Sequence, residues 1–178
     1  MAVDHVKATG ITNSDSSPRV ANTAGIGASA DLKFADGYAT AVASSSADAT
    51  YQLVRVPSDA IIKAIAFASE AQGAGKFDIG CYYATDGSKA DAATSLLAAA
   101  AIDQDFFATA IDCASLVAET LITNESTTYT LAKQQQPLWQ ALGLTSDPKC
   151  NIDIVATVVT TAVTTGTGKF GIKVWYVV

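Results

Sequence analysis

IDIVATVV at residues 152–159 and KFGIKVWYVV at residues 169–178 decide the fold of this chain. Both stretches alternate apolar side chains with other residues at a period of two, which is the pattern of a β-strand. The residues TTGTG at 164–168 are typical of a flexible turn, so we predict that the two strands form a long antiparallel hairpin. Because both faces of this hairpin are partly apolar, we expect central sheet positions or an interface.

Further strand candidates lie upstream at short spacing. Alternation in KFDIGCYY at 76–83 places Phe77, Ile79 and Cys81 on one face. In residues 60–69 the larger apolar residues share one face and small alanines occupy the other. The dipeptide Asp36-Gly37 is typical of a hairpin turn, and we expect it to separate two short strands. The remaining strand candidates are residues 51–56, 116–122 and 127–131, and we expect a strand or a single turn at residues 106–111.

Helical patterns are short. Pro137 at the start and Gly143 at the end predict one or two helical turns over PLWQALG. Residues 88–101 are ambiguous, and we expect a loop with a short helix after a turn at Asp86-Gly87, with Asp91 as a possible N-cap. About eight short strands without alternating long helices favour an all-β fold: an antiparallel β-sandwich, jelly-roll-like, rather than an α/β fold.

Residues 1–30 differ from the rest of the chain. They lack sustained periodicity and are rich in Ser, Gly and Ala. Isolated apolar residues in this stretch, Ile11, Val20 and Ile26, are candidates for docking on a neighbour. We therefore predict two parts: residues 1–30 as an extended, irregular N-terminal arm and residues 31–178 as the β-sandwich domain.

Composition excludes several partner classes. The chain is 49% hydrophobic and 16% charged, and its net charge is −6. The 11 basic residues are scattered, whereas nucleic acid and anionic membranes are bound by concentrated Lys and Arg. The start lacks the apolar region of a secretory signal, and the longest apolar run, Leu96–Ile102, is too short to span a bilayer. We expect synthesis in a cytoplasm, with no nucleic acid and no membrane as partners.

The sequence offers little for catalysis. The single histidine, His5, lies in the predicted arm, so neither a Ser-His-Asp nor a Cys-His arrangement has a fixed imidazole. Carboxylate pairs for glycoside hydrolysis are set by the fold, and no Asp or Glu here stands in a recognisable setting. We predict that the protein is not an enzyme.

Three partial motifs resemble ligand sites. Gly25–Ala30 matches G-x-G-x-x-A, but the strand that must precede this motif is missing. Gly166–Lys169 resembles part of a phosphate loop, but Phe170 replaces its Ser or Thr. Asp103 and Asp105, with Asp112 nearby, lack the full spacing of a calcium loop, and a solvated edge or strand-end cap is favoured. We predict no catalytic, cofactor-binding or metal-binding residues and no cofactor.

The remaining side chains of interest have structural interpretations. The cysteines Cys81, Cys113 and Cys150 are odd in number and far apart, so we expect small buried thiols that stay reduced. Asn124-Glu125-Ser126 fits a glycosylation pattern that has no meaning without secretion. We expect Trp139 to pack the short helix into the core and Trp175 to lie in the core or at an interface.

Five segments together carry a family resemblance. They are LVRVPSDA at 53–60, FDIGCYY at 77–83, DQDFFA at 103–108, QPLWQALGL at 136–144 and the ending at 169–178. In this order they resemble small virion proteins of tailed bacteriophages that are commonly encoded beside the major capsid protein. Some members of that family act as head decoration or cement proteins. The resemblance covers roughly residues 50–178, leaves the arm unmatched, and implies no catalytic residues.

The resemblance implies a capsid decoration or cement protein. Such a protein binds the outer surface of the major capsid shell and stabilises it by bridging capsomers. The expected partner is the major capsid protein, the expected location is the virion, and the expected assembly is a homo-oligomer, with a trimer favoured. The alternative is a receptor- or carbohydrate-binding module of a phage tail or fibre. That alternative needs an exposed aromatic platform, for example Tyr82, Tyr83 or Trp175.

Overall fold

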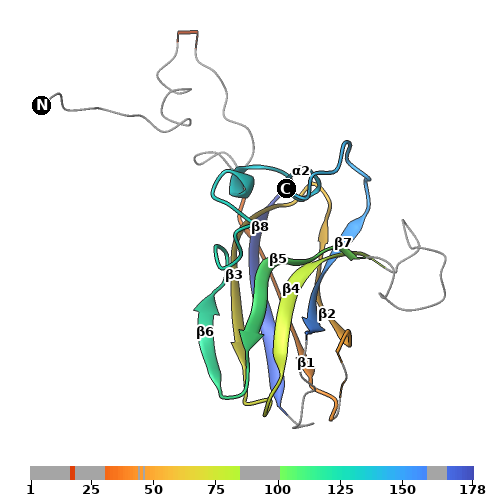
Figure 1. Cartoon of the computed structure of the whole chain (residues 1–178). Coiled ribbons are helices and arrows are strands. Elements are labelled where there is room, and N and C mark those ends of the chain that lie inside the picture. The colour runs from red at the N-terminus through yellow and green to blue at the C-terminus, as the bar shows by residue number, and fades with distance from the viewer. Residues whose placement is uncertain (1–16, 19–30, 44, 46, 85–100, 160–167) are drawn as a thin grey trace, which may run out of the picture.

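The computed structural model describes residues 17–18, 31–43, 45, 47–84, 101–159 and 168–178 (Figure 1). These residues form two four-stranded antiparallel sheets and almost no helix. The elements are β1 Lys33–Thr40, β2 Thr50–Pro57, β3 Ile61–Ser69, β4 Lys76–Tyr83, β5 Ala101–Asp112, β6 Val117–Leu121, the 3₁₀ turn η1 Lys133–Gln135, α2 Leu138–Ala141, β7 Asn151–Val158 and β8 Lys169–Val177.

The strand order is that of a jelly roll. One sheet has the order β1-β8-β3-β6 and the other has the order β2-β7-β4-β5. Strands pair from the outside of the sequence inward, β1 with β8, β2 with β7, β3 with β6 and β4 with β5, as in one long hairpin. The added pairs β3·β8 and β4·β7 roll that hairpin into two layers. The predicted all-β, jelly-roll-like sandwich is confirmed.

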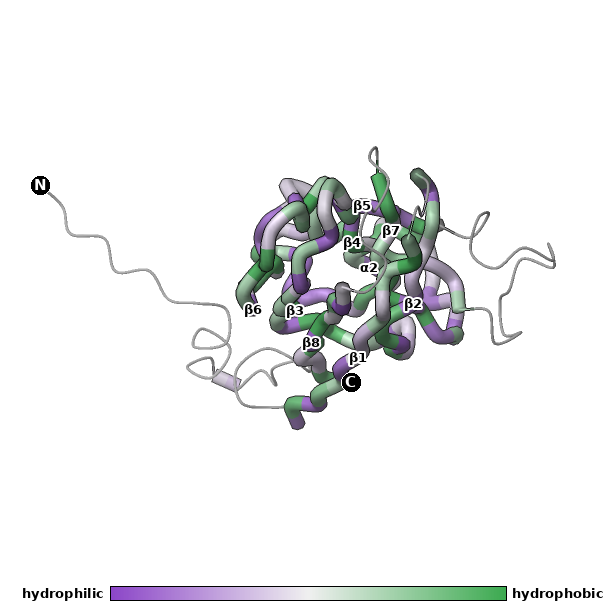
Figure 2. The backbone as a smooth tube through the Cα atoms, turned by 90° about the horizontal axis from the view of Figure 1, so that it is seen from below, coloured by the Kyte–Doolittle hydropathy of each residue, from purple (hydrophilic) through white to green (hydrophobic). Residues whose placement is uncertain are grey.

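The core lies between the two sheets (Figure 2). Alternation along β4 and β8 turns one face of each strand inward, and the rings of Phe77 and Phe170 meet there with centroids 4.6 Å apart. Tyr51 adds an edge contact 5.1 Å from Phe170. Because Phe77 and Phe170 belong to different sheets, this contact joins the two layers. Burial of such aromatic side chains supplies much of the energy that holds a sandwich together.

A second aromatic cluster lies beside β5. Phe106 and Phe107 on β5 pack against Tyr129, which is 1% exposed and donates a 2.6 Å hydrogen bond from its hydroxyl to the Ile62 carbonyl. Burial raises the pKa of Tyr129 far above its ordinary value. The predicted strand at residues 127–131 is wrong, since this stretch is a series of bends. The stretch resembles a strand because it contains Tyr129, which is buried in the core, and not because it pairs with a neighbouring strand.

The predicted hairpin between the last two strands is also wrong. β7 lies between β2 and β4, whereas β8 lies in the other sheet between β1 and β3. Ten residues separate β7 from β8, which is long for a hairpin loop, and most of them, 160–167, lie outside the described residues. The central sheet positions predicted from the two-sided apolar pattern are confirmed for both strands.

The predicted turn at Asp36-Gly37 is wrong for a different reason. β1 runs straight through both residues, which pair with Lys173 and Ile172 of β8. A β-carbon at position 37 would lie 1.9 Å from the Leu53 carbonyl oxygen of β2. The glycine is needed because the edges of the two sheets approach each other closely here, and not because the chain turns.

The short helix over residues 137–143 is confirmed as α2, and Gly143 follows it with a φ of +80°. The predicted turn at Asp86-Gly87 and the helix near Asp91 lie outside the described residues, except that Ala101 begins β5. Gly25–Ala30 and almost all of the arm also lie outside them. The division at residue 30 therefore stays a prediction.

Candidate functional site

The outer face of the β1-β8-β3-β6 sheet has a floor of small residues. In β3 the side chains of Ile65 and Phe67 turn into the core and are 0% exposed. The intervening alanines therefore face outward. Ala66 pairs with Lys173 of β8 and Ala68 pairs with Gly171. Without large side chains at these positions, the middle of this sheet face is low.

Taller side chains stand on both sides of this floor. On β1, Tyr38 is 74% exposed, and just before β6, Leu116 is 71% exposed. Between them lies a groove of about 580 Å³. We call this groove the outer groove. Its lining residues are Asp36–Tyr38, Ala66, Ala68–Glu70, Leu116–Glu119 and Lys169–Lys173.

Charges at the rim of the outer groove are nearly balanced. The Lys173 ammonium lies 2.5 Å from the Glu119 carboxylate across β3, and the Lys169 ammonium lies 5.7 Å from the centre of the Tyr38 ring. The Lys169 backbone N–H donates a 2.7 Å hydrogen bond to the Glu70 carboxylate. Exposed ion pairs such as Glu119–Lys173 contribute little stability. The outer groove therefore has an apolar floor and a rim whose opposite charges nearly cancel.

An aromatic pair stands at one end of the outer groove. Phe34 on β1 and Trp175 on β8 are register partners, and their ring centroids lie 5.5 Å apart. Phe34 is 52% exposed although it is a large apolar side chain. Leu121, which is opposite Ala66 on β6, is 67% exposed. Four large exposed apolar residues, Phe34, Tyr38, Leu116 and Leu121, thus lie on this one face of the molecule, a concentration typical of a contact surface.

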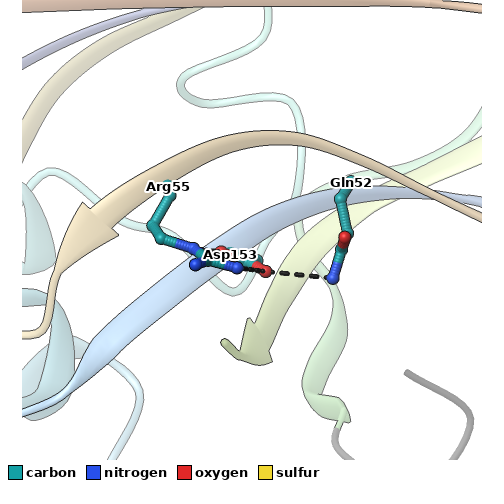
Figure 3. A network of polar contacts seen from close by, with 3 residues as sticks. All are labelled: Gln52, Arg55 and Asp153. Carbon is teal, nitrogen blue, oxygen red and sulfur yellow. Dashed lines mark hydrogen bonds and ion pairs between the residues drawn. The ribbon is translucent and has the colours of Figure 1, made fainter. Parts of the chain in front are cut away.

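The outer face of the β2-β7-β4-β5 sheet is built differently (Figure 3). Asp153 on β7 is 2% exposed and receives two hydrogen bonds from Arg55 on β2, at 2.6 and 2.9 Å. Gln52 adds a third hydrogen bond of 3.1 Å to the same carboxylate. A buried carboxylate needs such partners, because an uncompensated charge away from water is costly.

The three aromatic residues named for a binding platform do not form one. Tyr82 is 2% exposed, and its hydroxyl forms a 2.8 Å hydrogen bond with Thr157. Burial raises the pKa of this tyrosine. Tyr83 lies on the same strand and is partly buried, whereas Trp175 lies on the other sheet. A platform that includes Tyr82 is excluded, and only Trp175 of the three borders the outer groove region.

The acidic residues of β5 are engaged locally. The Asp112 carboxylate accepts a 2.9 Å hydrogen bond from the Ala114 backbone N–H at the end of the strand, as a strand-end cap does. Burial raises the pKa of Asp103, and the neighbouring Asp105 raises it further. Among the residues that the structure describes, no three His, Cys, Asp or Glu side chains gather where they could hold a metal ion.

Cys81, Cys113 and Cys150 are buried and form no disulfide bond, as predicted, and burial raises the pKa of Cys113 to about 11. The residue that anchors α2 in the core is Leu138, which is 1% exposed, while Trp139 is only partly buried. His5 lies outside the described residues.

A smaller recess of about 410 Å³ lies near the start of β7 and is lined by loop residues together with Pro57 of β2 and Asn151 of β7. There the Ser58 hydroxyl donates a 2.5 Å hydrogen bond to Asp147 and lowers the pKa of that carboxyl. The Lys149 backbone N–H donates to the same carboxylate at 2.8 Å. These contacts fix the loop conformation.

Within the part of the chain that the structure describes, no helix is long and apolar enough to cross a membrane. No protein-family model matches the sequence, and no curated protein matches it. Among solved structures, the fold is similar to a chain of the "Cyanophage Pam1 capsid asymmetric unit", with a TM-score of 0.51. The match covers 92% of this chain and 96% of that chain at 13% sequence identity. This likeness is one of fold across nearly the whole length of both chains.

Proposed function

We propose that this protein is a structural component of a phage capsid. In finer detail, we propose a decoration or cement protein that binds the outer surface of the major capsid shell and bridges its capsomers. The observation that carries the proposal is the outer groove, an apolar surface left open on one face of a jelly roll. A surface of this kind is suited to contact with another protein chain.

The residues around the outer groove have the chemistry of an interface. Tyr38, Leu116 and Leu121 are each more than two-thirds exposed, and the floor between them is low and apolar. Covering such side chains removes apolar surface from water, at about 25 cal/mol for each Å². A cement protein works through this kind of burial across several subunits and needs no reacting group.

Two likenesses support the capsid assignment. The fold is similar to a chain of a cyanophage capsid over 92% of this sequence. Independently, five sequence segments between residues 53 and 178 resemble virion proteins encoded beside the major capsid protein. Jelly rolls also occur in lectins and cupins, so the fold alone does not distinguish these roles. We propose that the partner is the major capsid protein, that the assembly is a homo-oligomer such as a trimer, and that the protein has no enzymatic activity.

The direct test is co-sedimentation of the purified protein with empty, undecorated heads of the phage that encodes it, followed by cryo-EM. We expect density at capsomer junctions. Leu116→Glu places a charge at the rim of the outer groove and should weaken binding at least about tenfold. The matched control is Leu131→Glu, since Leu131 is also 71% exposed but does not line the groove. Absence of density on the heads with the unmodified protein would exclude the cement function.

One observation favours a second candidate, the receptor- or carbohydrate-binding module of a tail or fibre. The Phe34–Trp175 pair offers a half-exposed aromatic surface beside the outer groove, and sugars stack on such rings. A glycan array with the unmodified protein and with Trp175→Ala tests this candidate. Binding that Trp175→Ala abolishes, together with no binding to heads, would replace the capsid proposal.

A further inference from the structure

We propose that the outer groove binds residues 1–30 of a second copy of this chain, so that neighbouring copies are linked by an exchanged N-terminal segment. This inference rests on the proposed function, because it names the partner that fills the groove in the assembled protein.

The groove has room for a short extended peptide. It runs beside β8 from Lys169 to Lys173, and five residues of extended chain span about 16 Å. Around Ala68 and Gly171 its floor carries no side chain larger than a methyl group, whereas at Ala66 the Lys173–Glu119 ion pair crosses β3. A floor of small residues lets a peptide backbone approach closely, while Tyr38 and Leu116 flank it on both sides.

Residues 1–30 have a matching composition. More than half of them are Ala, Gly, Ser or Thr, which do not fill a shallow groove. Among them stand the isolated aliphatic residues Ile11, Val20 and Ile26. The segment contains two acidic and two basic side chains, and the groove lining is also nearly balanced in charge. Apolar contact, rather than attraction between net charges, would therefore decide the binding.

The length of the segment permits exchange between copies. Thirty residues span at most about 100 Å when fully extended. A strand of nine residues, such as β8, spans about 30 Å. The segment is thus long enough to leave its own sandwich and reach a groove on the next one.

The junction with β1 favours a second copy over the same copy. The segment joins β1 at Lys33, which pairs with Tyr176. The next register pair is Phe34 with Trp175, and the groove begins beyond it at Asp36. To reach its own groove the segment must reverse direction and cross this aromatic pair. A segment from a neighbouring copy meets no such requirement.

Exchange would also suit a cement protein. Copies linked through their segments bind a shell at several points, and each later contact forms at a high effective concentration. The groove would then contribute to shell binding by holding copies together.

Cysteine cross-linking of the full chain tests the proposal without phage heads. Three segment variants, Ile11→Cys, Val20→Cys and Ile26→Cys, are each mixed with a groove variant, Leu116→Cys, and oxidised. Leu131→Cys is the matched control, because both leucines are 71% exposed and only Leu116 lines the groove. The native thiols Cys81, Cys113 and Cys150 are buried, so the unmodified chain gives the background.

We expect at least one segment variant to form a mixed disulfide dimer with Leu116→Cys, with at least about fivefold more product than with Leu131→Cys. Equal yields at the two positions would overturn the proposal, because they would report random collisions. If Leu116→Cys does not fold, Tyr38→Cys on the opposite rim replaces it.

A double variant, Ile26→Cys with Leu116→Cys in one chain, separates exchange from folding back. A link that forms within single chains and is insensitive to dilution, without mixed dimers, would overturn the proposal in favour of the chain's own segment. Co-sedimentation with heads is read separately. Head binding without any mixed dimer would reject the exchange and leave the capsid function standing.

Discussion

The outer faces of the two sheets are built on opposite plans. On the β2-β7-β4-β5 sheet, Asp153 and Thr157 of β7 and Tyr82 of β4 are at most 2% exposed and hydrogen-bond to partners within the sheet. On the β1-β8-β3-β6 sheet, Tyr38 and Leu121 are at least 67% exposed above a floor of small residues. The polar side chains on the outer face of the β2-β7-β4-β5 sheet hydrogen-bond within that sheet, whereas the outer face of the β1-β8-β3-β6 sheet exposes apolar side chains to solvent.

The same contrast separates the small residues of the two faces. Gly80 on β4 is small because the backbone of β5 lies over it, with the Gln104 carbonyl oxygen 2.1 Å from where a β-carbon would stand. Ala68 on β3 borders open space in the outer groove. A small side chain thus has a packing role on one face and leaves a binding surface on the other.

The largest effect that we predict is that of Gly80→Ala. The added methyl group would meet the backbone carbonyls of Asp103 and Gln104 at about 2 Å, so β5 would have to shift. Overpacking of this kind against backbone should cost about 3 kcal/mol of unfolding free energy. Urea unfolding followed by circular dichroism measures the loss. A stability equal to that of the unmodified protein would show that β5 does not lie over β4 in this way.

The next largest effect is the loss of unfolding free energy when a carboxylate is removed from the outer face of each sheet. Asp153→Ala deletes the acceptor of Arg55 and Gln52 in the buried network. Because the Arg55 side chain is 42% exposed, we discount the usual cost of a broken buried pair and expect about 2 kcal/mol. Glu119→Ala is the matched change on the open face, where both partners of the pair are exposed, and we expect less than about 0.5 kcal/mol. Equal losses in urea unfolding would contradict the contrast between the faces.

A third pair of variants separates filling a groove from filling the core. Ala68→Leu should change the unfolding free energy by less than about 0.5 kcal/mol, because its side chain enters open space. It should nevertheless weaken binding to phage heads, because the added side chain fills the outer groove. Ala156→Leu, on the 0% exposed inner face of β7, should cost about 2 kcal/mol by overpacking. Unchanged head binding by a stable Ala68→Leu protein would show that the outer groove does not contribute to shell binding.

The sequence predicted the strands well wherever one face is fully buried. Alternation in β4 and β8 identified which side chains turn inward, since a period of two follows directly from strand geometry. It did not identify the partners of these strands. β7 and β8 are adjacent in the sequence but belong to different sheets, because hydrophobic periodicity records the buried face and carries no information on the neighbouring strand.

Two other errors share one physical cause. The sequence pattern predicted a turn at Gly37 and a strand at Tyr129. Each residue is instead explained by its own contact with a strand distant in the sequence. Gly37 accommodates the Leu53 carbonyl of β2, and the Tyr129 hydroxyl reaches the Ile62 carbonyl of β3. Local sequence patterns cannot reveal a requirement that comes from a segment many residues away.

The sequence predicts the floor of the outer groove but not the residues that flank it. The alanines of β3 stood opposite Ile65 and Phe67 in the alternation, which places them on the outer face. The alternation does not show whether that face is covered or open, since this depends on the strand order. Tyr38 and Leu116 flank the alanines because β1 and β6 are the two edge strands of the sheet. The Arg55–Asp153 network likewise becomes recognisable only from the register of β2 against β7.

The smallest effect that we predict is a pH dependence of stability from the β2-β7-β4-β5 sheet. Burial, and then the neighbouring Asp105, raise the pKa of Asp103 on β5 above its ordinary value. A carboxyl with a raised pKa in the folded protein keeps its proton over a range in which the unfolded chain has lost it. Its contribution to the free energy of unfolding is therefore fully present below the ordinary carboxyl range and is lost as the pH rises through the raised value.

Urea unfolding at several pH values between about 3 and 7 should show this decline in stability. Asp103→Asn should remove it, whereas Asp59→Asn, which deletes one negative charge at an exposed position, should leave it in place. A decline that persists in Asp103→Asn would assign the pH dependence to another group.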